Sequence, residues 1–395
     1  MIETLPEGWR SVPFWSLFYR DKQIGFPEEE LLSVYREYGV IRKEDRDDNH
    51  NRAGDDLASY QLVEPGDLVL NKMKTWQGSL GISGYRGIVS PAYFVYKSRN
   101  SEISEFLHYA LRSRYYVTQY ASFSKGVRPS QWDLQPEYLS MMRVLLPPLS
   151  TQKSIVKYLA QEIGEIDAML AKLTSLSELV SERRREIVRS VLKSVGQTVR
   201  LGLVVDVVSG SGFPDKFQGV PDEELPFYKV SSLSNMDRQV LTDSGNTVSR
   251  EIADQLGARV IPSQSVVMAK IGAALLLARY ALTSRPSCID NNMQALVPHR
   301  DVIVSRFLAY AMEDVSIPSL VKSGPVPSLD VMGMKMSRIA FSPSIKEQCR
   351  IADHLDEVTG RIDAMLTKID ELKALLVERR AALISDVVTG RKKVA

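Results

Sequence analysis

A stretch of 45 residues occurs twice in this chain, and it constrains the fold more than any other feature. Residues 147–191 align without a gap on residues 343–387, at an offset of 196 positions, and 17 of the 45 aligned positions are identical. The shared residues include Gln152 and Gln348, Gly164 and Gly360, and the Glu-Arg-Arg triplets at 182–184 and 378–380. A repeat spaced by about half the chain, with dissimilar sequence between the copies, predicts two equivalent structural halves.

Both copies have the hydrophobic period of a coiled-coil helix. Apolar residues recur every seven positions, and a second set lies in the middle of each heptad. We therefore predict a helix-pair interface made of Ile166, Met169, Leu173, Leu176, Val180 and Ile187 in the first copy and Ile362, Met365, Ile369, Leu372, Leu376 and Leu383 in the second. Leu179 and Leu375 widen the apolar stripe.

Neither helix can bury such a stripe alone, and burying one of these side chains contributes roughly 1.5–3 kcal/mol. We expect the two helices, 165–192 and 361–388, to pack on each other as an antiparallel coiled coil. The alternative is two unrelated surface helices, each lying on its own domain. Glycine inside a helix costs about 1 kcal/mol relative to alanine, so Gly164 and Gly360 predict a kink or break between a short helix (151–163, 347–359) and the long one.

The remaining sequence forms two segments of one plan. Each has short strands, glycine turns and one amphipathic helix, and each ends in a strand before Pro147 or Pro343. Lys270 follows a strand as Lys72 does, and residues 322–328 correspond to residues 125–130. The predicted fold class is α+β, with two similar domains (1–146 and 197–342) alternating with two helical spacers (147–196 and 343–395).

Composition narrows the possible functions. A chain of 395 residues is too long for one hydrophobic core. Its 50 Lys+Arg and 48 Asp+Glu give a net charge of +2, which by itself neither indicates nor excludes binding to nucleic acid. Two cysteines and four histidines cannot form a zinc cluster or a disulfide framework. Neither a signal peptide nor an apolar run of 18 residues is visible in the sequence. We expect a soluble, cytoplasmic protein that contacts no membrane.

The sequence contains no motif for catalysis or for cofactor binding. It has no G-x-x-x-x-G-K-[ST] phosphate loop. The tetrapeptide at 90–93 resembles the adenine-gripping motif of methyltransferases but lacks its first amide, so Tyr93 is interpreted as strand core. The Gly210-x-Gly212 pair lacks the third glycine of a dinucleotide fold. Acidic residues do not pair with a lysine in a nuclease-like pattern.

Binding is therefore the predicted function. Lysines after a strand suit phosphate contacts, and asparagine, glutamine and arginine suit base edges in the major groove. The candidate DNA-binding residues of the first domain are Asn49, Asn51, Arg52, Lys72, Lys74, Trp76, Gln77, Lys125 and Arg128; those of the second are Lys270, Asn291, Asn292, Gln294 and Lys322. For residues 72–77 the alternative is a solvated strand end with Trp76 in the core. For residues 49–52, within a strongly charged stretch, the alternative is ordinary loop solvation.

The residues and their order resemble the DNA-specificity subunits of Type I restriction-modification systems. GDLVLNKMKTWQGSLG at 66–81, GIVSPAY at 87–93 and the IDAML…ERR helices carry the resemblance, which covers essentially the whole chain. It implies two target-recognition domains, each reading one half of a bipartite site in double-stranded DNA, held apart by the helix pair. It also implies two methyltransferase subunits and translocase–nuclease subunits as partners. S-adenosylmethionine, ATP and magnesium would then belong to those partners, and this chain would bind no cofactor and catalyse no reaction.

Two other functions stay open at this point. One is a non-catalytic coiled-coil scaffold whose globular domains bind protein. The other is a self-sufficient methyltransferase. The second domain diverges more from the family pattern than the first, and Ser344 stands where the first copy has Pro148.

Overall fold

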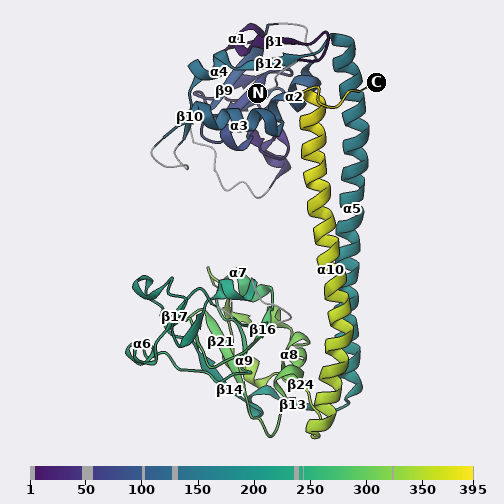
Figure 1. Cartoon of the computed structure of the whole chain (residues 1–395). Coiled ribbons are helices and arrows are strands. Elements are labelled where there is room, and N and C mark those ends of the chain that lie inside the picture. The colour runs from purple at the N-terminus through teal and green to yellow at the C-terminus, as the bar shows by residue number, and fades with distance from the viewer. Residues whose placement is uncertain are drawn as a thin grey trace. The chain divides into compact units, whose positions relative to one another are not determined.

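The structure is a computed structural model that describes residues 5–46, 57–99, 103–126, 132–234, 240–242, 244–322 and 324–394. The chain forms two compact units: the first unit comprises Met1–Leu173 with Glu371–Ala395, and the second comprises Thr174–Asp370. Each unit combines an α+β domain with part of two long helices (Figure 1). Across the described ranges, none of the helices is both long and apolar enough to cross a membrane.

The two long helices are α5 (Leu149–Ser194) and α10 (Ile345–Val388). They pack together and run side by side in Figure 1. In the first unit Arg380 lies 3.6 Å from Asp167, and in the second unit Arg184 lies 2.9 Å from Asp363. Each ion pair joins an early residue of one helix to a late residue of the other, so the helices are antiparallel. The predicted antiparallel coiled coil is confirmed.

The predicted break at the two glycines is wrong. Gly164 and Gly360 lie inside α5 and α10, which are continuous there. Both are exposed, and a Cβ added at either would meet nothing within 4 Å. The helix continues because neighbouring side chains such as Ile163 and Ile166 are buried, and their burial outweighs a glycine cost of about 1 kcal/mol.

Eight of the twelve predicted seam residues are buried or half-buried, and the other four are exposed. The positions seven apart are buried or half-buried: Ile166, Leu173, Val180, Ile187, Ile362, Ile369, Leu376 and Leu383. The intervening residues are not: Met169 is 50% exposed, Leu176 45%, Met365 51% and Leu372 43%. Leu170 and Leu366, both half-buried, take the intervening positions instead.

Helical geometry explains this difference. At about 100° per residue, Leu170 lies about 40° from Ile166 around the helix, whereas Met169 lies about 60° away on the other side. The seam therefore follows Leu170, and Met169 falls on its flank. Leu179 and Leu375, at 63% and 61% exposure, continue the same exposed flank.

The first unit is built on a four-stranded antiparallel sheet of order β2-β9-β6-β7. Its strands are β1 (Arg10–Pro13), β2 (Phe18–Arg20), β3 (Leu32–Tyr35), β4 (Gly39–Arg42), β5 (Gln61–Val63), β6 (Leu68–Asn71), β7 (Leu80–Ile82), β8 (Gly87–Val89), β9 (Tyr93–Ser98), β10 (Ser124–Lys125), β11 (Asp133–Leu134) and β12 (Arg143–Leu146). Its helices are α1 (Phe14–Leu17), η1 (Lys43–Asp45), η2 (Thr75–Gln77), α2 (Ser104–Arg112), α3 (Arg114–Phe123) and α4 (Pro136–Met141).

The second unit is built on a five-stranded sheet of order β14-β21-β18-β19-β16. Its strands are β13 (Thr198–Arg200), β14 (Val205–Ser209), β15 (Leu225–Tyr228), β16 (Val240–Leu241), β17 (Thr247–Val248), β18 (Val266–Ala269), β19 (Tyr280–Thr283), β20 (Cys288–Ile289), β21 (Met293–Pro298), β22 (Val321–Lys322), β23 (Ser328–Leu329) and β24 (Arg338–Ala340). Its helices are η4 (Leu201–Leu203), η5 (Asp215–Phe217), η6 (Val230–Ser234), α6 (Arg250–Gln255), α7 (Ala273–Leu276), α8 (Ser305–Glu313), η7 (Ile317–Leu320) and α9 (Val331–Met336).

The two units share a plan, as the sequence predicts. In each, the strand that enters the domain pairs with the strand that leaves it: β1 with β12, and β13 with β24. β14, β21, β18 and β19 occupy the places of β2, β9, β6 and β7. The central strand β6 lies between β9 and β7, and its Leu68, Val69 and Leu70 are fully buried. Leu68 and Leu70 share a core cluster with Phe106 and Leu107 of α2, whereas Val69 belongs to a second cluster on the other face of the strand.

A repeated glutamine joins each domain to its long helix. Gln152 is fully buried; its Oε1 accepts from the backbone N–H of Ile103 at 3.1 Å and its Nε2 donates to the Pro147 carbonyl at 3.0 Å. Gln348, also fully buried, accepts from the Val304 N–H at 2.7 Å. Ile103 and Val304 immediately precede α2 and α8. Each glutamine therefore satisfies a free N–H at the start of a domain helix.

Candidate nucleic-acid interface

Backbone hydrogen bonds bring three segments together around Lys72 at the end of β6. The Lys72 N–H donates to the Ala92 carbonyl at 3.0 Å, which ties β6 to the turn before β9. The Leu134 N–H donates to the Lys72 carbonyl at 3.0 Å, which adds the β10–β11 hairpin. We call residues 72–77, 90–92, 124–126 and 132–134 the loop edge of the first unit. It unites the predicted residues Lys72, Lys74, Trp76, Gln77 and Lys125.

The Lys72 ammonium lies over an aromatic ring beside a second cation. Its Nζ is 4.8 Å from the centre of the Phe94 ring and donates to the Pro91 carbonyl at 2.5 Å. The Arg20 guanidinium lies 4.5 Å from the same ring. Partial burial, reinforced by Arg20, lowers the pKa of Lys72. Sequence reasoning missed Arg20, although the Arg20-Asp21-Lys22 triplet at the end of a strand was a visible signal.

The β6–β7 connection holds the next predicted residues in a short helix, η2. Asn71 Oδ1 accepts from the N–H groups of Met73 and Lys74 at 3.0 and 3.1 Å, which starts the turn. Gly78, at φ 97°, returns the chain into β7. Lys74 and Gln77 are exposed.

The sequence left two interpretations of Trp76 open, a surface residue that contacts DNA and a core residue, and the structure lies between them. It is half-buried, donates from Nε1 to the Met73 carbonyl at 3.0 Å, and packs against the Trp132 ring at 5.1 Å. It is therefore neither a free surface aromatic nor a core residue. Trp132, which sequence reasoning did not select, belongs to the same loop edge.

The hairpin lysines make contacts within their own domains. Lys125 Nζ is 3.1 Å from the Tyr138 hydroxyl and 4.7 Å from the centre of its ring. Lys322 Nζ is 3.7 Å from Asp330 Oδ1. Both side chains are exposed, so both can reach an external phosphate by exchanging one polar partner.

The second unit has an equivalent loop edge: residues 270–272, 290–292, 321–322 and 327–329. The Lys270 N–H donates to the Asn292 carbonyl at 2.7 Å, and the Leu329 N–H donates to the Lys270 carbonyl at 2.9 Å. These bonds match those of Lys72. Lys270, Asn291, Asn292 and Lys322 therefore lie in one loop edge, as Lys72, Lys74, Trp76, Gln77 and Lys125 do in the first unit.

The side chains around Lys72 and Lys270 differ. By sheet register, Gln294 in β21 takes the place of Phe94, and Val207 in β14 takes the place of Arg20. Gln294 is fully buried, where its Oε1 accepts from Ser209 at 3.1 Å. Its side chain therefore does not reach the surface, in contrast to the expectation of a DNA contact. A strand alternates its faces, and the sequence did not reveal which face Gln294 occupies.

Four predicted DNA-binding residues lie outside the described residues: Asn49, Asn51, Arg52 and Arg128.

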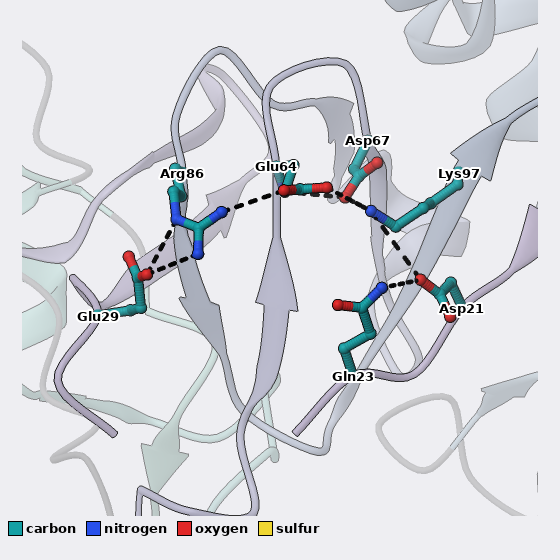
Figure 2. Close-up of polar contacts among 7 residues, drawn as sticks. All are labelled: Asp21, Gln23, Glu29, Glu64, Asp67, Arg86 and Lys97. Carbon is teal, nitrogen blue, oxygen red and sulfur yellow. Dashed lines mark hydrogen bonds and ion pairs between the residues drawn. The ribbon is translucent and has the colours of Figure 1, made fainter. Parts of the chain in front are cut away.

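The opposite end of β6 carries a network of seven polar residues: Asp21, Gln23, Glu29, Glu64, Asp67, Arg86 and Lys97 (Figure 2). Lys97 Nζ lies 2.5 Å from Glu64 Oε2, and Arg86 NH1 lies 3.1 Å from Glu64 Oε1. The hydrogen bond from Lys97 lowers the pKa of Glu64, whereas burial raises the pKa of Asp67. The network joins β9 to the turns around β5, β6 and β8.

This arrangement is that of a structural ion-pair network. Each carboxylate near Lys97 has a cationic or amide partner: Gln23 Nε2, for example, donates to Asp21 Oδ2 at 2.7 Å. Within the described part of the chain, no group of three or more His, Cys, Asp or Glu side chains is placed to hold a metal ion. The loop edges remain the candidate sites.

Comparisons with known proteins agree with the predicted resemblance. No family model matches the chain. The specificity subunit of the Type I restriction enzyme StySPI from Salmonella potsdam is 18% identical over 412 residues, covering 93% of this chain and 85% of that protein. A chain in a solved type I restriction-modification system superposes with a TM-score of 0.64 at 16% identity, covering 98% of this chain and 100% of that one. The HsdS subunit from Thermoanaerobacter tengcongensis gives a TM-score of 0.45 at 17% identity, with 99% of each chain covered.

The similarities to the StySPI subunit and to the chain with the TM-score of 0.64 extend over both domains and both helices, and the chain has the fold of Type I restriction-modification specificity subunits, which it resembles along nearly its whole length.

Proposed function

We propose that this chain is the DNA-specificity subunit of a Type I restriction-modification assembly and is not itself catalytic. Each domain reads one half of a bipartite target in double-stranded DNA. The helix pair sets the distance between the half-sites and docks two methyltransferase subunits. Translocase–nuclease subunits join for cleavage, and S-adenosylmethionine, ATP and magnesium are bound by the partners.

One observation carries the proposal: the two domains present the same backbone scaffold around Lys72 and Lys270 but surround it with different side chains. A repeated cation next to a repeated hairpin suits phosphate contacts, which position a protein without reading sequence. Arg20 and Phe94 in the first unit, against Val207 and Gln294 in the second, give each edge its own shape and charge. Two edges with one scaffold and different chemistry suit two different half-sites.

Exposed apolar side chains on the helices support a partner present in two copies. The first unit exposes Met169, Leu372 and Leu375, and the second exposes the repeat equivalents Met365, Leu176 and Leu179. Each unit therefore presents one apolar patch, and large exposed apolar patches mark sites of protein association.

The DNA-binding proposal is tested with the chain assembled with its methyltransferase partner. We expect tight binding to the methylated motif, weak binding to a scrambled duplex, and a steep fall in affinity with salt. Lys72→Ala should weaken binding to all duplexes and reduce the slope of log K against log salt by about 1. Lys346→Ala, which removes an exposed lysine at the start of α10, is the matched control. Equal binding to motif and scrambled duplexes would favour a protein-binding scaffold.

The assignment of one domain to each half-site is tested by a chimera. Replacing residues 1–146 with the corresponding domain of another specificity subunit should change one half-site of the methylated motif and leave the other unchanged. Sequencing of methylated genomic DNA reports both half-sites. A change in both would contradict the assignment.

The docking patches are tested by stoichiometry. The triple change Met169→Ser, Leu372→Ser and Leu375→Ser should reduce the number of bound methyltransferase subunits from two to one, as measured by native mass spectrometry. The equivalent triple change at Met365, Leu176 and Leu179 should do the same. Two subunits bound to both variants would argue against these surfaces.

The role of the helices in spacing is tested by lengthening both. The ion pairs Asp167–Arg380 and Arg184–Asp363 place Leu173 opposite residue 374. Inserting seven residues after Leu173 and seven after Lys373 keeps the heptad phase and lengthens the pair by about 10 Å, or about three base-pair steps. We expect the methylated motif to gain a longer spacer with both half-sites unchanged. An unchanged spacer in an active variant would show that something else fixes the distance.

A further inference from the structure

The two units differ in charge at one equivalent position where the domain meets the long helices. α2 (SEFLHYALR) and α8 (SRFLAYAME) align from their first serines, and the repeated glutamines contact the residues just before them. In this alignment Arg112 is the equivalent of Glu313. The repeat also makes Arg380 the equivalent of Arg184, and Asp167 the equivalent of Asp363.

In the second unit the residues at these three positions, Arg184, Glu313 and Asp363, are joined by two ion pairs. Arg184 NH1 lies 2.7 Å from Glu313 Oε2, and Arg184 Nε lies 2.9 Å from Asp363 Oδ1. The Arg184 and Glu313 side chains are only 14% and 16% exposed. One arginine therefore has a carboxylate on either side.

In the first unit these three positions hold one carboxylate, Asp167, because an arginine replaces the glutamate; the charge of Glu37 also acts on Arg112. The Arg380 NH2 group lies 3.6 Å from Asp167 Oδ2, longer than either pair in the second unit. Among the described residues, the Nε atoms of Arg112 and Arg380 are both buried and lack a hydrogen-bond partner. Burial, followed by the charge of Arg380, lowers the pKa of Arg112 to about 10.

Arg112 is nevertheless held firmly in place. Its NH2 group donates to the carbonyls of Arg36 and Glu37, both at 2.8 Å, and its NH1 group lies 2.6 Å from His108 Nε2. These contacts anchor the turn between β3 and β4 to α2. Arginine guanidinium groups are common partners of carboxylates and phosphates in proteins, and Arg112 and Arg380 each have one donor without a partner among the described residues.

We propose that Arg112 and Arg380 form an oxyanion-binding site in the first unit. The bound group is a phosphate or a carboxylate, and it occupies the place that the Glu313 carboxylate has in the second unit. Its source is either inorganic phosphate from solution or an acidic side chain of the methyltransferase subunit. The second source rests on the proposed function, whereas the first does not.

The first arm of the test measures phosphate binding to the full-length chain by isothermal titration calorimetry at constant ionic strength. We expect about one site per chain. Arg380→Gln should raise the Kd at least about tenfold, since a charged hydrogen-bond donor is lost. Arg380→Glu places a carboxylate beside Arg112 and should abolish binding. Arg189→Gln removes an exposed arginine that pairs with Asp314, and should leave the Kd unchanged.

The second arm applies to the acidic side chain. Here the free chain does not bind phosphate, but Arg380→Gln and Arg380→Glu weaken one of the two methyltransferase-binding events at least about tenfold, whereas Arg189→Gln weakens neither. If neither phosphate nor partner binding responds to the Arg380 variants, the proposal is overturned. If the wild-type chain binds no methyltransferase subunit at all, the proposed function fails, and the phosphate arm alone decides the site. Circular dichroism confirms that each variant is folded.

Discussion

Gln348→Leu should destabilise the second unit selectively. Gln348 is fully buried and makes three hydrogen bonds: it accepts from the Val304 N–H at 2.7 Å and donates to the carbonyls of Val302 and Ser342 at 2.9 and 2.7 Å. Leucine has a similar size but can make none of them. One donor and two acceptors would then be buried without partners.

Leaving a buried polar group unsatisfied costs about 1–3 kcal/mol. Some of this cost is relieved by local adjustment, so we expect a loss of about 3 kcal/mol in the free energy of unfolding. Since every 1.4 kcal/mol is about tenfold, the population of the opened second unit should rise roughly 150-fold.

The chain offers a probe for each unit. Cys288 is fully buried in the second unit, and burial raises the pKa of its thiol to about 11, so thiol reagents react with it only when the unit opens. Cys349→Ser leaves it as the single reporter. All four tryptophans lie in the first unit: Trp9, Trp15, Trp76 and Trp132.

We therefore expect Gln348→Leu to speed Cys288 labelling roughly 150-fold while the unfolding curve from tryptophan fluorescence is unchanged. Gln152→Leu should do the reverse. Gln348→Glu should be nearly as harmful as leucine, because a carboxylate can accept from Val304 but cannot donate to two carbonyls. If glutamate restored the slow labelling rate, the hydrogen bonds would not be the reason for the stability of this junction.

Three further outcomes follow from the ion pairs and turns. Glu313→Ala should lower the free energy of unfolding by about 2–3 kcal/mol in urea titrations, whereas Arg189→Ala, at an exposed pair, should cost less than about 1 kcal/mol. Lys97 lowers the pKa of Glu64, so the contribution of Glu64 to folding stability is fully present above its unfolded pKa, near 4.5, and is lost as the pH falls through its lower folded pKa. The difference in the free energy of unfolding between wild type and Lys97→Met should therefore be present at pH 7 and shrink by pH 3. Gly78→Ala should destabilise the first unit by about 1–2 kcal/mol in fluorescence-monitored unfolding, because its φ of 97° is strained for an L-residue; a loss under about 0.3 kcal/mol would contradict this.

The sequence determined the parts of this protein that depend on local periodicity and on repetition. Apolar residues every seven positions predict a long helix from local geometry alone. The ungapped repeat predicts two equivalent helices, each with an apolar stripe, and each stripe can be buried against the other. The correspondence of Lys72 with Lys270 was likewise readable, since each follows a buried strand after a proline turn, and the matching backbone hydrogen bonds bear it out.

Only the tertiary structure decided which face of each element meets its neighbour. Met169 and Leu170 are adjacent in sequence and similar in hydrophobicity, and the position of the partner helix leaves Leu170 half-buried and Met169 exposed. Gln294 faces inward and Arg20 joins Lys72 over Phe94 for the same kind of reason, because strand pairing sets the faces. The exchange of Glu313 for Arg112 is visible in the sequence, but its meaning depends on Arg184 and Arg380, which reach those positions from helices far away in the chain. Periodicity fixes what a residue is next to along its own element, whereas contacts between elements depend on packing that no single segment contains.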